Sequence, residues 1–131
     1  MFTARSNLSA RQVTLMIAGL LGAAGVALAA ASAHIPNGQA AQSAAYLLIM
    51  HTTAAVATLA VSFQFENRNI FRISTALMLL GSTLFAADIA LRAFGIAARL
   101  FPNAAPMGGI LMIAGWLTLA LAAIISSRPK N

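Results

Sequence analysis

Four long apolar segments fill most of this chain and restrict it to a membrane-embedded fold. They are Val13–Ala33, Ala44–Phe63, Phe71–Phe94 and Met107–Ile125. Each has about 20 residues, the length that a helix needs to cross roughly 30 Å of hydrocarbon. A soluble domain of 131 residues could not bury so much apolar surface. The sequence therefore predicts an all-α integral membrane protein with a single transmembrane domain over residues 1–131.

The composition agrees with this class and excludes several kinds of chemistry. Hydrophobic residues make up 60% of the chain and charged residues only 8%, where a globular domain has about 25% charged residues. The chain has no cysteine, which excludes disulfides, thiolate metal sites and a thiol nucleophile. The net charge of +6 comes from residues near the segment ends. We interpret it as a topology and lipid-headgroup signal, with no nucleic-acid partner.

The connections between the segments are short and contain turn residues. Pro36-Asn37-Gly38 follows the first segment, and Asn67-Arg68-Asn69 separates the second from the third. Pro102-Asn103 ends the extension of the third, and Pro106 is expected to open the fourth helix. Because short loops join antiparallel neighbours, we expect an up-down-up-down four-helix bundle without internal repeats.

The basic residues are distributed unevenly between the two ends of such a bundle. Six lie at the end that holds both termini, and two lie at the other end. The six are Arg5, Arg11, Arg68, Arg72, Arg128 and Lys130, and the two are Arg92 and Arg99. The positive-inside rule then predicts that both termini are cytoplasmic.

A cleaved secretory signal is an alternative for the first segment. Basic residues precede it, and Ala31-Ser32-Ala33 resembles a cleavage site. However, its apolar stretch has about 20 residues, where the apolar region of a signal peptide has 7–15. We therefore expect it to be a membrane-spanning helix.

Small residues recur inside the apolar segments at helical spacing. Gly22 and Gly25 belong to such a stripe in the first segment, Gly81 in the third, and Gly115 in the fourth. Membrane helices associate through close packing of small residues, so these glycines are predicted at helix–helix contacts. Trp116 is expected to pack beside Gly115, where its N–H must either find a partner inside the bundle or remain unpaired at a cost.

Two ionisable residues lie well inside the apolar segments, away from the segment ends, where they require a physical reason. His51 and Asp88 are both predicted near the outer end of the bundle, and Arg92 follows Asp88 at i+4 spacing. The start of the fourth helix, with Pro106, Gly108 and Gly109, is expected at the same level. These six residues form a candidate polar site. It either binds a ligand, a headgroup or a proton, or it holds the bundle together.

Catalysis and cofactor binding find little support in the chain. Asp88 has no second embedded carboxylate beside it, and no nucleophile motif is present. Haem ligation by His34 and His51 is conceivable, but two isolated histidines are weak support for a metal or haem site. We expect no catalytic residues, no metal and no cofactor.

Four short motifs resemble those of the bacterial domain-of-unknown-function 423 family. They are GAAGVALAAASAH at Gly22–His34, Met50-His51-Thr52, Leu84-Phe85-Ala86-Ala87-Asp88, and Ala105-Pro106-Met107-Gly108-Gly109 followed by Ile113-Ala114-Gly115-Trp116. The resemblance covers about residues 13–125, and Asp88 stands where many members have serine. It implies a four-helix bacterial inner-membrane protein, related to a small mitochondrial membrane protein, and implies no particular activity.

Two functional expectations follow. The first is a non-catalytic packing or accessory protein that acts through the lipid bilayer or a larger membrane protein complex. The second is a small solute or proton conduit that uses His51 and Asp88.

Overall fold

The computed structural model describes residues 8–126, and every regular element within that range is helical. The elements are α1 (Ala10–Ser32), α2 (Gln39–Val61), the short 3-10 helix η1 (Ser62–Gln64), α3 (Arg68–Ala93) and α4 (Ala104–Ile125). The predicted all-α class is confirmed. Arg5, Arg128 and Lys130 lie outside the described residues.

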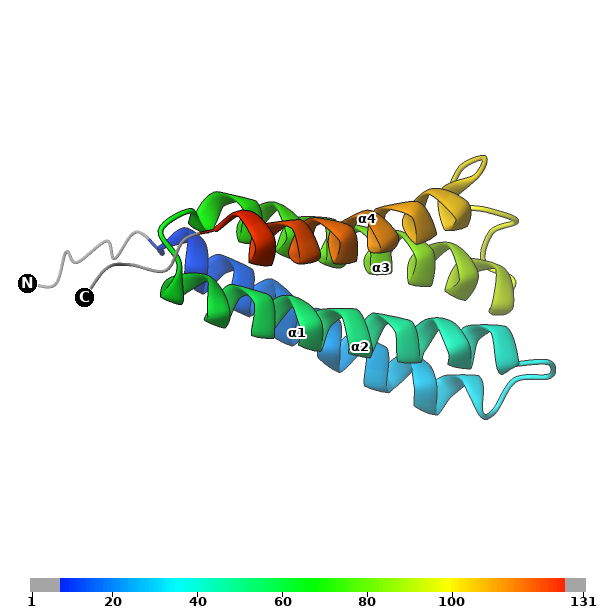
Figure 1. Ribbon diagram of the computed structural model, residues 1–131. Coiled ribbons are helices and arrows are strands. Elements are labelled where there is room, and N and C mark those ends of the chain that lie inside the picture. The colour runs from blue at the N-terminus through cyan, green and yellow to red at the C-terminus, as the bar shows by residue number, and fades with distance from the viewer. Residues whose placement is uncertain (1–7, 127–131) are drawn as a thin grey trace, which may run out of the picture.

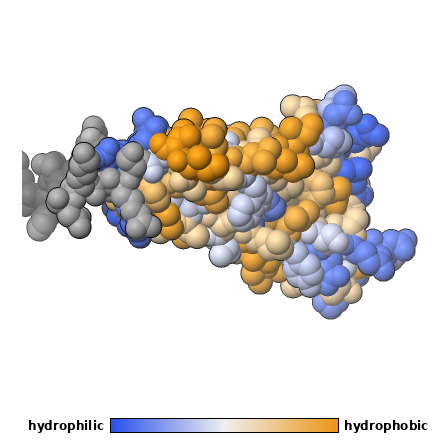
Figure 2. Space-filling model, viewed as in Figure 1, coloured by the Kyte–Doolittle hydropathy of each residue, from blue (hydrophilic) through white to orange (hydrophobic). Residues whose placement is uncertain are grey.

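Each of the four α-helices is long and apolar enough to cross a membrane. Figure 2 shows a largely apolar band between two hydrophilic ends, which is the distribution expected of a protein that crosses a bilayer. Successive helices run antiparallel, so α1 begins and α4 ends at the same end of the molecule (Figure 1). The chain is therefore an up-down-up-down bundle of membrane-spanning helices.

The two middle helices form the centre of the bundle. α3 packs along both α2 and α4, whereas α1 packs mainly along α2. In Figure 1, α1 and α2 form one layer, and α3 and α4 form the other. As a result, α2 and α3 bury a larger share of their residues than the flanking helices α1 and α4 do.

All four helices begin three to five residues before the apolar segments predicted from the sequence, at residues 10, 39, 68 and 104 instead of 13, 44, 71 and 107. Hydropathy detects only the part of a helix that lies in hydrocarbon, and the helix can continue into the polar interface. At α1, Ser9 and Gln12 form a capping box that fixes the earlier start. The second connection is correspondingly shorter than expected, because Arg68 already belongs to α3.

Pro106 does not open α4, as the sequence suggested, but is its third residue. Asn103 precedes the helix in a left-handed conformation (φ 66°), and the N–H of Ala104 donates to the carbonyl of Phe101. The proline is still accommodated in the first turn, because the N–H groups there have no partner within the helix.

The end of α3 is set by a glycine turn. Gly95 has a φ of +66°, its N–H donates to the carbonyl of Arg92, and the N–H of Ile96 donates to that of Leu91. These two bonds form a Schellman motif, which favours glycine at the left-handed position. They direct the following chain back over the end of the bundle.

Four of the glycines singled out from the sequence lie at close helix contacts. Gly81 on α3 and Gly108 on α4 face each other: a Cβ on either one would lie 2.7 Å from the carbonyl oxygen of the other. A Cβ on Gly115 would lie 2.8 Å from Met78 Cγ, and one on Gly25 2.7 Å from Ile49 Cγ1. The α3–α4 contact thus depends on backbone meeting backbone.

Gly22 has more room than these positions. A Cβ there would lie 3.8 Å from the Cγ2 of Thr52 on α2, which is an ordinary van der Waals contact. Gly22 therefore faces α2 as expected, but the contact does not demand glycine.

Candidate functional site

Asp88 is the most deeply buried charged group in the described part of the chain. It lies on the last turns of α3, about 8 Å before the end of the helix at 1.5 Å per residue, and only 3% of its side chain is exposed. Arg92 Nη2 lies 2.7 Å from Asp88 Oδ2, the contact that the i+4 spacing predicted. The side chain of Arg92 is 41% exposed, so this ion pair links a buried carboxylate to an arginine at the surface.

The second oxygen of Asp88 binds the connection between α3 and α4. The backbone N–H of Leu100 donates to Asp88 Oδ1 at 2.8 Å. The sequence did not predict this partner, because any backbone N–H in the loop could have donated to the carboxylate. The Schellman turn at Gly95 sets the path of the loop and so decides which N–H lies beside Asp88. With both oxygens occupied, Asp88 fixes the loop over the end of the bundle.

A small polar cavity adjoins this carboxylate. It has a volume of about 190 Å³ and is lined by Asp88, Arg92, Arg99, Asn103, Ala104 and Pro106. Arg99 is the additional cation that the sequence analysis did not include in the candidate site. The carboxylate accepts from Arg92 and from the N–H of Leu100, so a charged, hydrogen-bonded group lies at the wall of this cavity.

His51 is held by a separate set of partners. Its Nδ1 lies 2.8 Å from the carbonyl oxygen of Leu47, one turn earlier on α2, and its Nε2 lies 3.1 Å from Trp116 Nε1 on α4. A carbonyl oxygen only accepts and an indole N–H only donates. These two bonds therefore require the imidazole tautomer that carries hydrogen on Nδ1.

The predicted polar site is thus divided between different contacts. Asp88, Arg92 and Pro106 line one cavity, while His51 pairs with Trp116. Gly108 packs against α3, and a Cβ on Gly109 would meet no atom within 4 Å. The six residues do not share one set of hydrogen bonds.

The described residues contain no cluster of three or more His, Asp or Glu side chains that could hold a metal ion. His34 is exposed in the first connection, whereas His51 is buried with both ring nitrogens hydrogen-bonded. Ligation by His51 would require it to give up its bond to Trp116 or to Leu47.

A comparison with known protein families finds a match over most of the bundle. The model of a family described as a protein of unknown function (DUF423) matches residues 21–109, which is more than half of the chain. The chain belongs to the DUF423 family. The matched range runs from α1 through the first turns of α4 and includes His51, Asp88 and Gly108. No curated protein and no solved structure matches this DUF423 chain.

Proposed function

We propose that this DUF423 protein is a non-catalytic membrane protein that acts through contacts of its helix surfaces with lipid or with a larger membrane complex. The observation that carries the proposal is the uncovered apolar surface of the flanking helices. Leu20 on α1 is 71% exposed and Ile124 on α4 is 81% exposed. Uncovered apolar faces of this kind are where a bilayer or a partner helix would pack.

The hydrogen bonding inside the bundle supports a packing role over a chemical one. Ser74 Oγ donates across helices to the carbonyl of Gly115, and Ser82 Oγ donates to that of Met78 within α3. Asp88 and His51 likewise have protein partners. Side chains that satisfy one another rigidify a core and are not arranged around a shared reaction centre.

For the location, we propose the bacterial inner membrane with both termini in the cytoplasm. Arg11, Arg68 and Arg72 lie at one end of the bundle, and Arg92 and Arg99 at the other. Under the positive-inside rule the first end faces the cytoplasm.

Extraction in native membrane discs, followed by mass measurement of the intact particles, tests the proposal. We expect a reproducible, stoichiometric complement of lipid or protein to remain with the chain. Recovery of the bare chain with a randomly varying lipid content, together with turnover of a substrate, would overturn it.

A further inference from the structure

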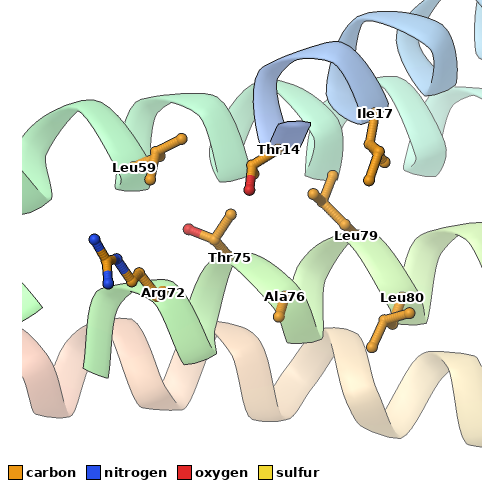
Figure 3. Close-up of a pocket in the computed structure, with 8 residues that line it drawn as sticks. All are labelled: Thr14, Ile17, Leu59, Arg72, Thr75, Ala76, Leu79 and Leu80. Carbon is orange, nitrogen blue, oxygen red and sulfur yellow. The ribbon is translucent and has the colours of Figure 1, made fainter. Parts of the chain in front are cut away.

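An apolar groove runs between α1 and α3, with α2 as its floor. Its first cavity has a volume of about 270 Å³ and is lined by Thr14, Ile17, Leu59, Arg72, Thr75, Ala76, Leu79 and Leu80. Figure 3 shows Arg72 at one end of this row and Leu80 toward the other, with Thr14 and Ile17 on the facing helix. A cavity of about 150 Å³ already admits benzene, so this volume accommodates a segment of hydrocarbon chain.

The groove continues in both directions along the same two helices. Toward the start of α1, a cavity of about 260 Å³ shares Thr14, Leu59 and Arg72 with the first and adds Arg11 and Phe63. Toward the other end of the bundle, a cavity of about 280 Å³ lies between the same helix faces. Its lining is Leu21, Ala24, Leu28, Leu48, Thr83, Ala86, Ala87 and Ala90.

The length of the first cavity matches one leaflet of a bilayer. From Arg72 to Leu80 along α3 is about 12 Å at 1.5 Å per residue, and one half of the hydrocarbon core is about 15 Å thick. The lining over this distance is almost entirely apolar, with the hydroxyl of Thr75 bonded to the carbonyl of Phe71. The first cavity thus provides an apolar slot that begins at a cation and reaches toward the bilayer midplane.

Positive charge gathers at the end of the groove where α1 begins. The guanidinium of Arg11 lies 4.5 Å from the ring centroid of Phe63, and that of Arg68 lies 5.1 Å from the same ring. Arg72 lines the groove with Arg11. The nearby acidic residue is Glu66, and among residues 8–126 the only ion pair joins Asp88 to Arg92 at the opposite end. Three arginines against one glutamate leave this end with uncompensated positive charge.

We infer that the α1–α3 groove binds one anionic glycerophospholipid, with an acyl chain between the helices and the phosphate at Arg11 and Arg72. Guanidinium groups bind phosphate through paired charge-assisted hydrogen bonds, and basic residues at the cytoplasmic surface attract anionic lipids. A partner helix would fill the apolar slot but leave the arginines unneutralised. The charge at the groove end therefore favours a phospholipid over a second protein.

This inference rests on the proposed function and specifies one of its contacts. The test uses the full-length chain purified in a neutral detergent, incubated with phosphatidylglycerol or with phosphatidylcholine of the same acyl chains. Native mass spectrometry then counts the lipids that each protein molecule retains. We expect one phosphatidylglycerol to be retained preferentially.

Two variants test the two parts of the proposed lipid site, the arginines that bind the phosphate and the apolar groove that holds the acyl chain. The double variant Arg11→Gln, Arg72→Gln should weaken retention of phosphatidylglycerol by about 30-fold, the factor expected for two arginines near an anionic headgroup, and should remove the preference over phosphatidylcholine. Ala76→Phe places a ring in the groove and should reduce retention of both lipids. Ala76 is exposed and lines the groove, so the added ring displaces lipid rather than core side chains.

Matched controls lie elsewhere on the chain. Arg99→Gln removes an arginine at the opposite end, and Ala120→Phe adds the same ring at an exposed position of α4. Both should retain phosphatidylglycerol as the wild type does. Thermal unfolding of every variant in lipid-free detergent verifies the fold.

Equal retention of the two lipids by the wild type, or unchanged phosphatidylglycerol retention in both groove variants, would overturn the inference. A dimer, or a partner protein seated in the groove and displaced by Ala76→Phe, would overturn it too, while leaving the proposed accessory function standing. The proposed function itself fails if native discs yield the bare chain with a randomly varying lipid content, together with turnover of a substrate.

Discussion

The indole N–H of Trp116 donates to the Nε2 of His51, with 3.1 Å between the two nitrogens, and so joins α4 to α2. The rings meet edge to face, with centroids 6.1 Å apart and an interplanar angle of 71°. These helices do not otherwise pack extensively. The pair is therefore a specific side-chain bridge between two helices that flank opposite sides of α3.

This bridge predicts a single imidazole tautomer. Solid-state ¹⁵N NMR of protein labelled at histidine should show hydrogen on Nδ1 of His51 and a bare, hydrogen-bonded Nε2. Trp116→Phe should shift the Nε2 resonance and lower the free energy of unfolding by about 0.5–1.5 kcal/mol, the usual contribution of one hydrogen bond. A His51 spectrum that is unchanged by Trp116→Phe would show that the bridge does not form.

The facing glycines of α3 and α4, Gly81 and Gly108, allow a more specific packing prediction than the spacing of small residues in the sequence. Gly81→Ala and Gly108→Ala should each lower the free energy of unfolding by about 1–3 kcal/mol, because each new Cβ meets backbone atoms that cannot rotate away. Gly109→Ala is the matched control, since its Cβ would meet nothing within 4 Å. Thermal unfolding in detergent ranks the three. If Gly109→Ala is as damaging as Gly81→Ala, α4 packs through a different face.

Asp88 should be more sensitive to the loss of its acceptor oxygens than to the loss of its charge. Asp88→Asn keeps one carbonyl oxygen that can accept from the N–H of Leu100, whereas Asp88→Leu leaves that N–H and Nη2 of Arg92 without their carboxylate partner. We expect the leucine variant to lose about 1–3 kcal/mol of stability and the asparagine variant clearly less. Hydrogen exchange at the amide of Leu100 should accelerate in Asp88→Leu. An unchanged exchange rate at Leu100 would show that the carboxylate of Asp88 does not hold the loop.

The membrane orientation is open to a direct topological test. Reporter fusions should read cytoplasmic near Asn67 and after Asn131, and external near Asn37, because the arginines concentrate at the end that holds both termini. An external signal after Asn131 would contradict the orientation.

Much of the fold could be predicted because the bilayer simplifies the problem. Apolar length identified all four helices, and turn residues such as Pro36 and Gly38 identified a connection correctly. The helices begin before the predicted apolar segments, since capping by Ser9 and the left-handed Asn103 extends helices beyond the apolar core. Hydropathy does not register such polar turns.

The candidate site was only partly predictable, for a related reason. Spacing along one helix correctly placed Arg92 beside Asp88. The partner of His51 depends instead on how α4 is rotated against α2, and the partner at Leu100 depends on the path of a loop. Their positions along the helices predicted that His51 and Asp88 lie at a similar depth in the membrane. Two residues at the same depth need not be in contact, and these two have separate hydrogen-bond partners.

The central claim is that the protein acts through contacts rather than by moving a solute or a proton. Proton flux across liposomes that contain the purified chain, measured under a pH gradient, tests this claim most directly. We predict that liposomes containing the wild type, His51→Leu or Asp88→Asn leak protons at the same rate as protein-free liposomes. Flux above that background in the wild type, abolished by Asp88→Asn or His51→Leu in a protein that remains folded, would contradict it.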